Sequence, residues 1–142
     1  MTDLTYVWRG DFTNAEVNAL HAEGFGHPML EDDWKAQVER HSLGWVCARE
    51  GDELVGFVNV PWDGGTHAFI LDTLVDARVR RQGIGTRMVA LAAEGARAAG
   101  CEWLHADFGD ELTAFYFDRC GFVPTPAGLI ALWPAGGSES KA

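Results

Sequence analysis

A strand-like run, a glycine-containing loop and a helix-like run follow one another between residues 71 and 93, and this succession constrains the fold more than any other feature of the sequence. The apolar, strand-prone run LDTLV ends near Asp76, and a basic turn follows it. The run IGTRMVALAA then places small and apolar side chains at helical spacing. We therefore expect a strand that leads through a tight turn into an amphipathic helix.

The loop between this strand and this helix, residues 80–85 with the sequence RRQGIG and here called the glycine loop, has the chemistry of an anion-binding site. Gly83 and Gly85 allow the backbone to approach a ligand without a Cβ atom in the way. The first N–H groups of the helix point out of the turn, and the helix dipole favours a negative charge there. Three arginines add charge that can hydrogen-bond phosphate oxygens: Arg80, Arg81 and Arg87.

Charge and motif spacing narrow the kind of anion. The chain has a formal net charge of −10, which argues against a nucleic-acid-binding surface. A local basic cluster in an acidic chain indicates a small anionic ligand instead. The sequence contains no G-x-x-x-x-G-K-[ST] loop, and its glycine spacing is not G-x-G-x-x-G, so two other phosphate-binding motifs fit poorly.

The cysteines and the hydropathy of the chain indicate a cytoplasmic protein. Cys47, Cys101 and Cys120 lack metal-ligand spacing, so we expect reduced, buried thiols and no metal site. No segment approaches the ~18 consecutive apolar residues of a membrane span, and the N-terminus lacks the pattern of a signal peptide.

Periodicity and turn residues predict one domain over residues 1–134, followed by a disordered tail over residues 135–142. Thr13 and Glu16 form a capping box, which predicts the start of the first helix. Asp110 is expected to cap a short helix over residues 111–119. Strands are expected over 4–9, 43–49, 54–60, 67–75 and 102–107, a second helix over 31–41, and a final hairpin from 121–123 to 129–133.

Two segments resemble motifs of one family. The glycine loop has the form Arg/Gln-x-x-Gly-x-Gly/Ala, and residues 114–122 (AFYFDRCGF) resemble the signature Phe/Leu-Tyr-x-x-x-x-Gly-Phe. Both are similar to motifs of the GNAT superfamily of acyl-CoA-dependent N-acyltransferases. The resemblance implies an α/β (α+β) fold, with a mixed, mostly antiparallel central sheet flanked by helices.

The resemblance also implies that the chain is an N-acetyltransferase with acetyl-CoA as its cosubstrate. In that family the strands that match residues 66–75 and 102–107 splay apart, and the pantetheine arm pairs with the first of them. The residues expected to contact acetyl-CoA are Leu74, Val75, Arg80, Arg81, Gln82, Gly83, Ile84, Gly85, Thr86, Phe115 and Arg119.

Two side chains are expected to carry the proton transfers. Tyr116 matches the family tyrosine beside the thioester sulfur, and a phenol with a reference pKa near ~10 can protonate the departing thiolate. Its alternative role is that of a core aromatic. Asp72 is the first candidate for the base, and strand alternation places it on the face of Ile70 and Leu74. Asp107 is the second candidate, His67 and His105 are weaker ones, and a chain without a base residue is a further alternative.

The acceptor side is less defined by the sequence. Trp8, His27 and Trp62 lie at strand ends or in loops and are expected to line an acceptor pocket, and Asp107 is expected to hold a cationic acceptor. The acceptor amine, a small molecule or a peptide, is not identified. A non-catalytic acyl-CoA-binding module is the alternative to an enzyme, and a homodimer is suggested by fold analogy alone.

Overall fold

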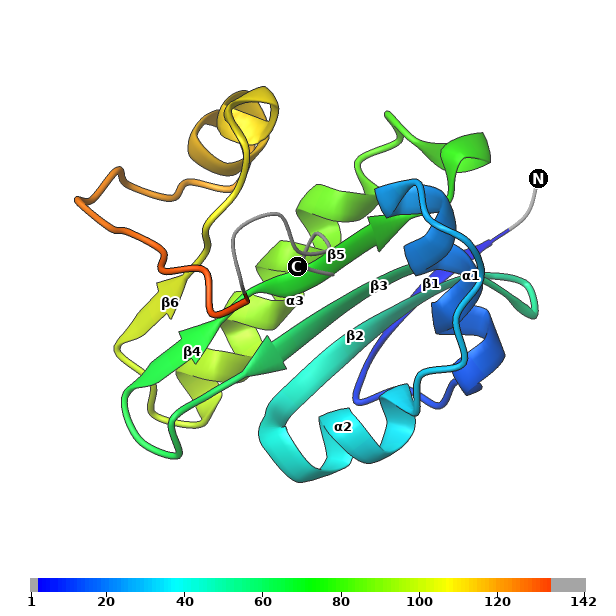
Figure 1. Ribbon diagram of the computed structural model, residues 1–142, viewed down its shortest axis with the longest axis horizontal. Helices are drawn as coiled ribbons and strands as arrows, with labels where there is room; N and C mark the ends of the chain where they lie inside the picture. Colours follow the sequence, from blue (N-terminus) through cyan, green and yellow to red (C-terminus); the bar gives the residue numbers. More distant parts are fainter. Residues whose placement is uncertain (1–2, 134–142) are drawn as a thin grey trace.

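The computed structural model describes residues 3–133, which form a sheet with α1 and α2 in front of it and α3 behind it in Figure 1. The tail expected over residues 135–142 lies outside the described residues. The elements in chain order are β1 (Leu4–Trp8), α1 (Asn14–Phe25), α2 (Trp34–His41), β2 (Ser42–Glu50), β3 (Glu53–Pro61), β4 (His67–Phe69), β5 (Leu71–Val75), η1 (Ala77–Val79), α3 (Ile84–Ala98), β6 (Trp103–His105), η2 (Asp110–Leu112) and η3 (Ala114–Arg119).

The strands form two connected sheets. β1, β2, β3 and β5 lie side by side in that order, and every pairing among them is antiparallel. β4 and β6 form a parallel pair beside them, and a bridge between Trp62 and Ala68 joins this pair to the end of β3. This arrangement confirms the expected mixed, mostly antiparallel sheet flanked by helices.

Each face of the sheet has its own core. The face toward α3 buries Val58 and Val60 of β3 against Ile84, Met88 and other residues of the helix. The face toward α1 and α2 buries Trp34, Phe57 and Leu74. No helix within residues 3–133 is long and apolar enough to cross a membrane.

The first helix begins as predicted. The Thr13 side chain accepts from the Glu16 N–H, and the Glu16 carboxylate accepts from the Thr13 N–H, which completes the capping box. The second helix was predicted to begin at residue 31 but begins at Trp34, because Asp33 caps it through the Ala36 N–H.

The strand predicted over residues 67–75 is two strands. From Asn59 to Phe57 the register advances two residues along β3, but it advances three along β5, from Leu71 to Leu74. β5 therefore carries a bulge, and Asp72 adopts a φ of 54° there. The bulge breaks the alternation, so the prediction of one shared face is wrong for Ile70, whereas Asp72 and Leu74 both lie on the face toward α1. Ile70 packs in the α3 core, whereas Leu74 packs in the α1 and α2 core.

The region after β6 differs most from the predictions. Asp110 is the first residue of the short 3-10 turn η2 and not its cap, and η3 is a π-helix, so no continuous helix spans residues 111–119. The predicted final hairpin is absent among the described residues, because none after β6 belongs to a strand. Pro124 and Pro126 lack the N–H donors that a strand ladder needs, and Ile130 is 85% exposed, without a sheet partner to cover it.

Candidate active site

The expected splay of two strands is present beside β5. β4 and β6 pair only over residues 67–69 and 103–105, and the last bond of this contact runs from the Ile70 N–H to the His105 carbonyl. Beyond this bond, β5 pairs with β3 alone, and residues 106–109 belong to no strand. β5 therefore has an edge without a sheet partner within residues 3–133, and an extended ligand could pair with it.

The glycine loop lies at the far end of β5 and opens α3. Gly83 occupies the N-cap position of α3 with a φ of 79°, and no side chain among residues 3–133 caps the helix. The first N–H groups of α3 therefore remain available to an anion. Arg81 is also in the left-handed region, with a φ of 67°, and this unfavourable backbone conformation costs about 1–3 kcal/mol.

The two glycines of the loop serve different purposes. A Cβ atom at Gly83 would meet no atom of the described residues within 4 Å, so this position requires glycine for its backbone angle. A Cβ atom at Gly85 would lie 3.1 Å from the Phe115 ring. Gly85 therefore lets η3 pack against the first turn of α3, which brings the segment that carries Tyr116 close to the glycine loop.

The arginines of the loop differ in their surroundings. The Arg80 Nε donates to the Val75 carbonyl at 3.2 Å, and its Nη2 lies 3.8 Å from Glu23 of α1. Glu23 also accepts from the Ala77 N–H at 2.8 Å and so fixes the start of the loop. Sequence reasoning missed Glu23, because nothing in its local pattern marks it. Arg80 must leave these partners to bind a phosphate, whereas Arg81 is exposed beside Gly83.

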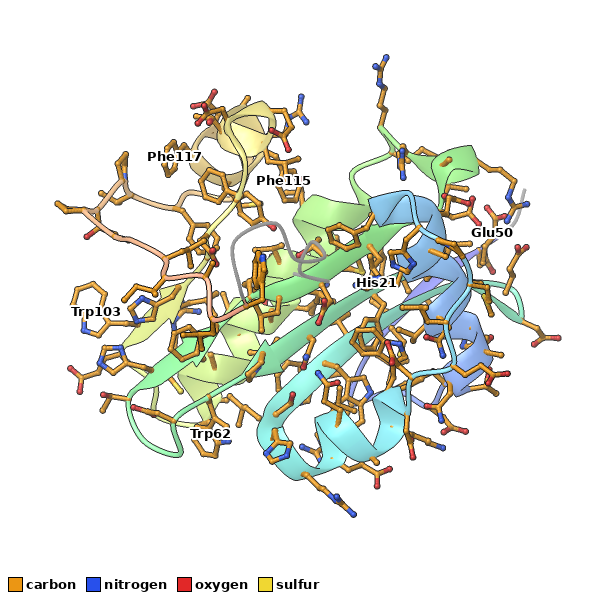
Figure 2. All side chains as sticks on the ribbon, viewed as in Figure 1. His21, Glu50, Trp62, Trp103, Phe115 and Phe117 are labelled. Atoms are coloured by element: carbon orange, nitrogen blue, oxygen red, sulfur yellow. The ribbon has the colours of Figure 1, made fainter. Side chains whose placement is uncertain are left out.

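The remaining residues expected to contact acetyl-CoA lie along β5, the loop and η3. The side chains of Leu74 and Ile84 are buried in the core, so only their backbone groups can meet a ligand. Phe115 and Phe117 lie on opposite sides of η3 in Figure 2, with Phe115 on the side of α3. Val75 and Thr86 are half-buried, and Gln82, Arg87 and Arg119 are exposed.

Tyr116 is 5% exposed and lies against β5 where that strand diverges from β6. Its hydroxyl is 3.2 Å from the Thr73 Oγ1, and its ring stacks on Phe108 with centroids 4.4 Å apart. Burial raises the pKa of Tyr116, and the hydrogen bond to Thr73 offsets part of this rise. The negative charge of Asp107 also raises this pKa, so Tyr116 keeps its proton at neutral pH.

Asp72 lies on the other face of β5 from Tyr116. Its Oδ1 is 3.5 Å from Nε2 of His21, which points from α1 toward β5 (Figure 2). The His21 side chain is 1% exposed and the Asp72 side chain 9%. Sequence reasoning missed His21, although it follows Val17 and Leu20 on the apolar face of α1, and a histidine on such a face is a detectable signal.

The residues expected to bind the acceptor do not all come together. His27 lies beside the pair formed by Asp72 and His21, because its Nε2 is 2.6 Å from Nδ1 of His21. Asp107 lies close enough to Tyr116 to affect its pKa. The Trp8 ring instead fills the space over Gly44 and Gly95, between the sheet and α3. Trp62 lies beyond the end of β3, away from His21 and Phe115 in Figure 2.

The three cysteines are poor nucleophiles at neutral pH. Burial raises the pKa of Cys47 to about 12, and it also raises the pKa of Cys101 and of Cys120. Cys47 is buried as expected, whereas Cys101 and Cys120 are half-buried. A covalent acyl intermediate on any of these thiols is therefore disfavoured.

Comparison with known proteins finds a similar sequence in rice. A rice (Oryza sativa subsp. japonica) protein named "Probable glucosamine 6-phosphate N-acetyltransferase 2" is 42% identical over 119 residues, which are 80% of this chain and 66% of the rice protein. The chain thus spans slightly less than two thirds of that relative.

Two solved structures share the fold. An acetyltransferase of Trypanosoma brucei has a TM-score of 0.76 at 19% identity, covering 91% of this chain and 99% of its own. Glucosamine-6-phosphate N-acetyltransferase of Arabidopsis thaliana has a TM-score of 0.71 at 16% identity, covering 92% and 99%. The model of the acetyltransferase (GNAT) family matches residues 5–122, and the chain therefore belongs to this family.

Proposed function

We propose that this protein transfers an acetyl group from acetyl-CoA to an amine, by direct attack in a ternary complex. One observation carries the proposal: the Tyr116 hydroxyl meets Thr73 on β5, where that strand has left β6 and its edge pairs with no strand of the described residues. At the other end of the same strand the uncapped start of α3 can hold the pyrophosphate. A donor that spans β5 would thus bring its thioester near the phenol.

The residues on the η3 side of β5 supply the donor half of the reaction. The amine nitrogen attacks the thioester carbonyl carbon, and a backbone N–H of β5 stabilises the negative oxygen that forms. The C–S bond then breaks, and the CoA sulfur takes the phenolic proton of Tyr116. The raised pKa of Tyr116 keeps this proton in place until the thiolate forms.

Asp72 supplies the acceptor half. The attacking amine must lose a proton, and the Asp72 carboxylate lies on the opposite face of β5 from Tyr116, so acid and base approach the reacting atoms from two sides. Asp107, near Tyr116, is the second candidate for this base and can also hold a cationic acceptor.

An amino sugar phosphate is the first acceptor to test. The rice relative carries the name of a glucosamine 6-phosphate N-acetyltransferase, and it is the most identical of the relatives described above. Cytoplasmic location, a homodimer, a single domain that ends at residue 134, and the absence of nucleic-acid or membrane partners stay predictions.

The test has two stages. Calorimetric titration with acetyl-CoA, with ADP as a control, measures donor binding. Thiol release is then followed with glucosamine 6-phosphate, kanamycin, spermidine and a lysine-containing peptide. Specific donor binding followed by amine-dependent thiol release supports the proposal. Binding without release from any amine favours the non-catalytic acyl-CoA-binding module, and an absence of binding contradicts both.

A further inference from the structure

Asp72 is one end of a chain of polar groups that leads to the surface. The Asp72 Oδ1 lies 3.5 Å from Nε2 of His21, and Nδ1 of His21 lies 2.6 Å from Nε2 of His27. Nδ1 of His27 lies 2.7 Å from the carbonyl oxygen of Pro28. His21 is fully buried, whereas His27 is half-buried in the segment after α1, so the chain runs from the interior toward solvent.

The last partner fixes the direction of the hydrogen bonds. A carbonyl oxygen only accepts, so Nδ1 of His27 carries a hydrogen. When His27 is neutral, its Nε2 is an acceptor, and Nδ1 of His21 must donate to it. The Nε2 of His21 is then the atom that faces the Asp72 carboxylate.

One extra proton can occupy three positions in this chain. It can lie on Asp72, with both histidines neutral, or on His21, which is then an imidazolium paired with the carboxylate. It can also lie on His27, in which case His21 donates through Nε2 to Asp72 and accepts through Nδ1 from His27. The three forms contain the same number of protons, so proton transfer along these contacts can convert one form into another.

His21 lies between α1, α2 and β5. Its imidazole faces Asp72 of β5 and His27, and its ring also lies against Phe25 at the end of α1 and Trp34 of α2. Asp72 holds a left-handed φ of 54° at the bulge, which is unfavourable for a residue with a Cβ atom. The residue with the unfavourable backbone angle is thus the one whose carboxylate faces His21.

We propose that Asp72, His21 and His27 form a proton relay, in which Asp72 takes the proton of the acceptor amine and His21 and His27 carry it to solvent. The proposal rests on the acetyl transfer proposed above. One N–H bond of the amine breaks and one O–H bond forms on Asp72. The proton then passes to Nε2 of His21 while Nδ1 of His21 gives its own to Nε2 of His27, and the doubly protonated His27 releases its Nδ1 proton to water. Tautomer exchange of the two imidazoles through water then restores the starting hydrogen-bond direction. No electrons are transferred, and His21 is a positioning residue that acts through Asp72.

The kinetic test compares three single substitutions in the full chain. His21→Gln and His27→Gln remove titrating rings of the relay, and His41→Gln makes the same change at an exposed histidine at the end of α2. With the panel amine that the wild type acetylates fastest, His21→Gln lowers kcat at neutral pH by about tenfold or more. The acid limb of its kcat profile moves down by at least about one pH unit, toward the range in which an isolated carboxyl titrates. His27→Gln has a smaller effect in the same direction, and His41→Gln has none.

A second measurement does not depend on activity. Nitrogen-15 NMR of the imidazoles in the wild type should show Nδ1 of His27 protonated, and Asp72→Asn should move the titration midpoints of both His21 and His27. Unchanged midpoints in Asp72→Asn, or an unchanged acid limb in His27→Gln, would overturn the relay even if the wild type acetylates amines. A wild type that acetylates none of the panel amines would instead contradict the proposed function, whereas coupled titration in the same protein would still show that Asp72, His21 and His27 share a proton.

Discussion

Asp72 and Thr73 are neighbours on β5, yet their side chains lie on opposite faces of the sheet and meet opposite kinds of partner. Thr73 contacts Tyr116, whose ring lies among Phe108, Phe115 and Phe122. Asp72 contacts His21, through which it connects to His27. The face toward η3 is apolar around the hydroxyls of Thr73 and Tyr116, whereas the face toward α1 contains a carboxylate and two imidazoles.

The two faces of β5 therefore suit different tasks: one side keeps a proton on Tyr116, and the other side can carry a proton away from Asp72. Apolar rings around Tyr116 disfavour its charged form, so the phenol retains a proton until a stronger base appears beside it. Asp72 instead faces the imidazole of His21, which connects it to His27. Tyr116 therefore suits the role of the acid, and the Asp72 carboxylate beside a histidine suits the role of the base that we propose.

Removal of the acid should have the largest effect. Tyr116→Phe should lower kcat by roughly 10²- to 10³-fold, because the thiolate then leaves without a positioned proton donor. The Kd for acetyl-CoA should stay unchanged, because the ring is retained. Steady-state kinetics and calorimetry measure the two quantities, and full activity in this variant would make Tyr116 a core aromatic.

The pH dependence of the wild type provides a further check on Tyr116. The protonated phenol is the active form, so activity is present below its pKa and is lost as the pH rises through it. Since burial raises this pKa from the ordinary value near ~10, the alkaline limb of kcat should lie above about pH 10. That limb should vanish in Tyr116→Phe.

Removal of the base should have the next largest effect. Asp72→Asn should lower kcat by about 10²-fold, the lower end for a positioned base, because water can carry the amine proton in its absence. Asparagine tolerates the left-handed backbone at this position, so the fold should persist. Asp52→Asn, in the exposed turn between β2 and β3, is the control. Equal rates in the two variants would move the role of base to Asp107 or to solvent.

A substitution in the glycine loop should weaken the binding of acetyl-CoA and leave both faces of β5 intact. Gly83→Val should raise the Kd for acetyl-CoA by about tenfold. The expected cause is the loss of charge-assisted hydrogen bonds between the loop and the pyrophosphate, which are worth about 1.5–3 kcal/mol. Gly100→Val is a matched control, because Gly100 follows the other end of α3 with a φ of 92° and also has open space around it. Both variants should lose about 1–2 kcal/mol of unfolding free energy, measured in urea. The assignment of the loop fails if their Kd values change equally.

The smallest effect is expected for a substitution of Thr73, the hydrogen-bond partner of Tyr116. Thr73→Val removes the hydrogen bond that lowers the pKa of Tyr116, so this pKa should rise further. The alkaline limb should therefore move to higher pH, and kcat should fall only about threefold, because a single neutral hydrogen bond is lost. A limb that moves to lower pH would contradict the proposed role of Thr73.

Sequence reasoning located the donor half of the site better than the acceptor half. The glycine loop, the start of α3 and Tyr116 depend on residues within short segments, and a local pattern therefore contains them. His21 and Glu23 reach the site from α1, and their partners Asp72 and Ala77 lie some fifty residues further along the chain. Trp8 is the opposite case: its position at a strand end suggested an acceptor pocket, but its ring packs over two glycines that are distant in the sequence.

The sequence by itself determined the family, the capping box of α1, and a strand, glycine loop and helix in succession. These features depend on contacts between residues near one another in the chain. Only the tertiary structure decided that β5 carries a bulge at Asp72, that Ile70 and Leu74 face different cores, and that no strand follows β6 within the described residues. Strand register depends on how distant segments pack, and one extra residue in a strand moves the following side chains to the other face.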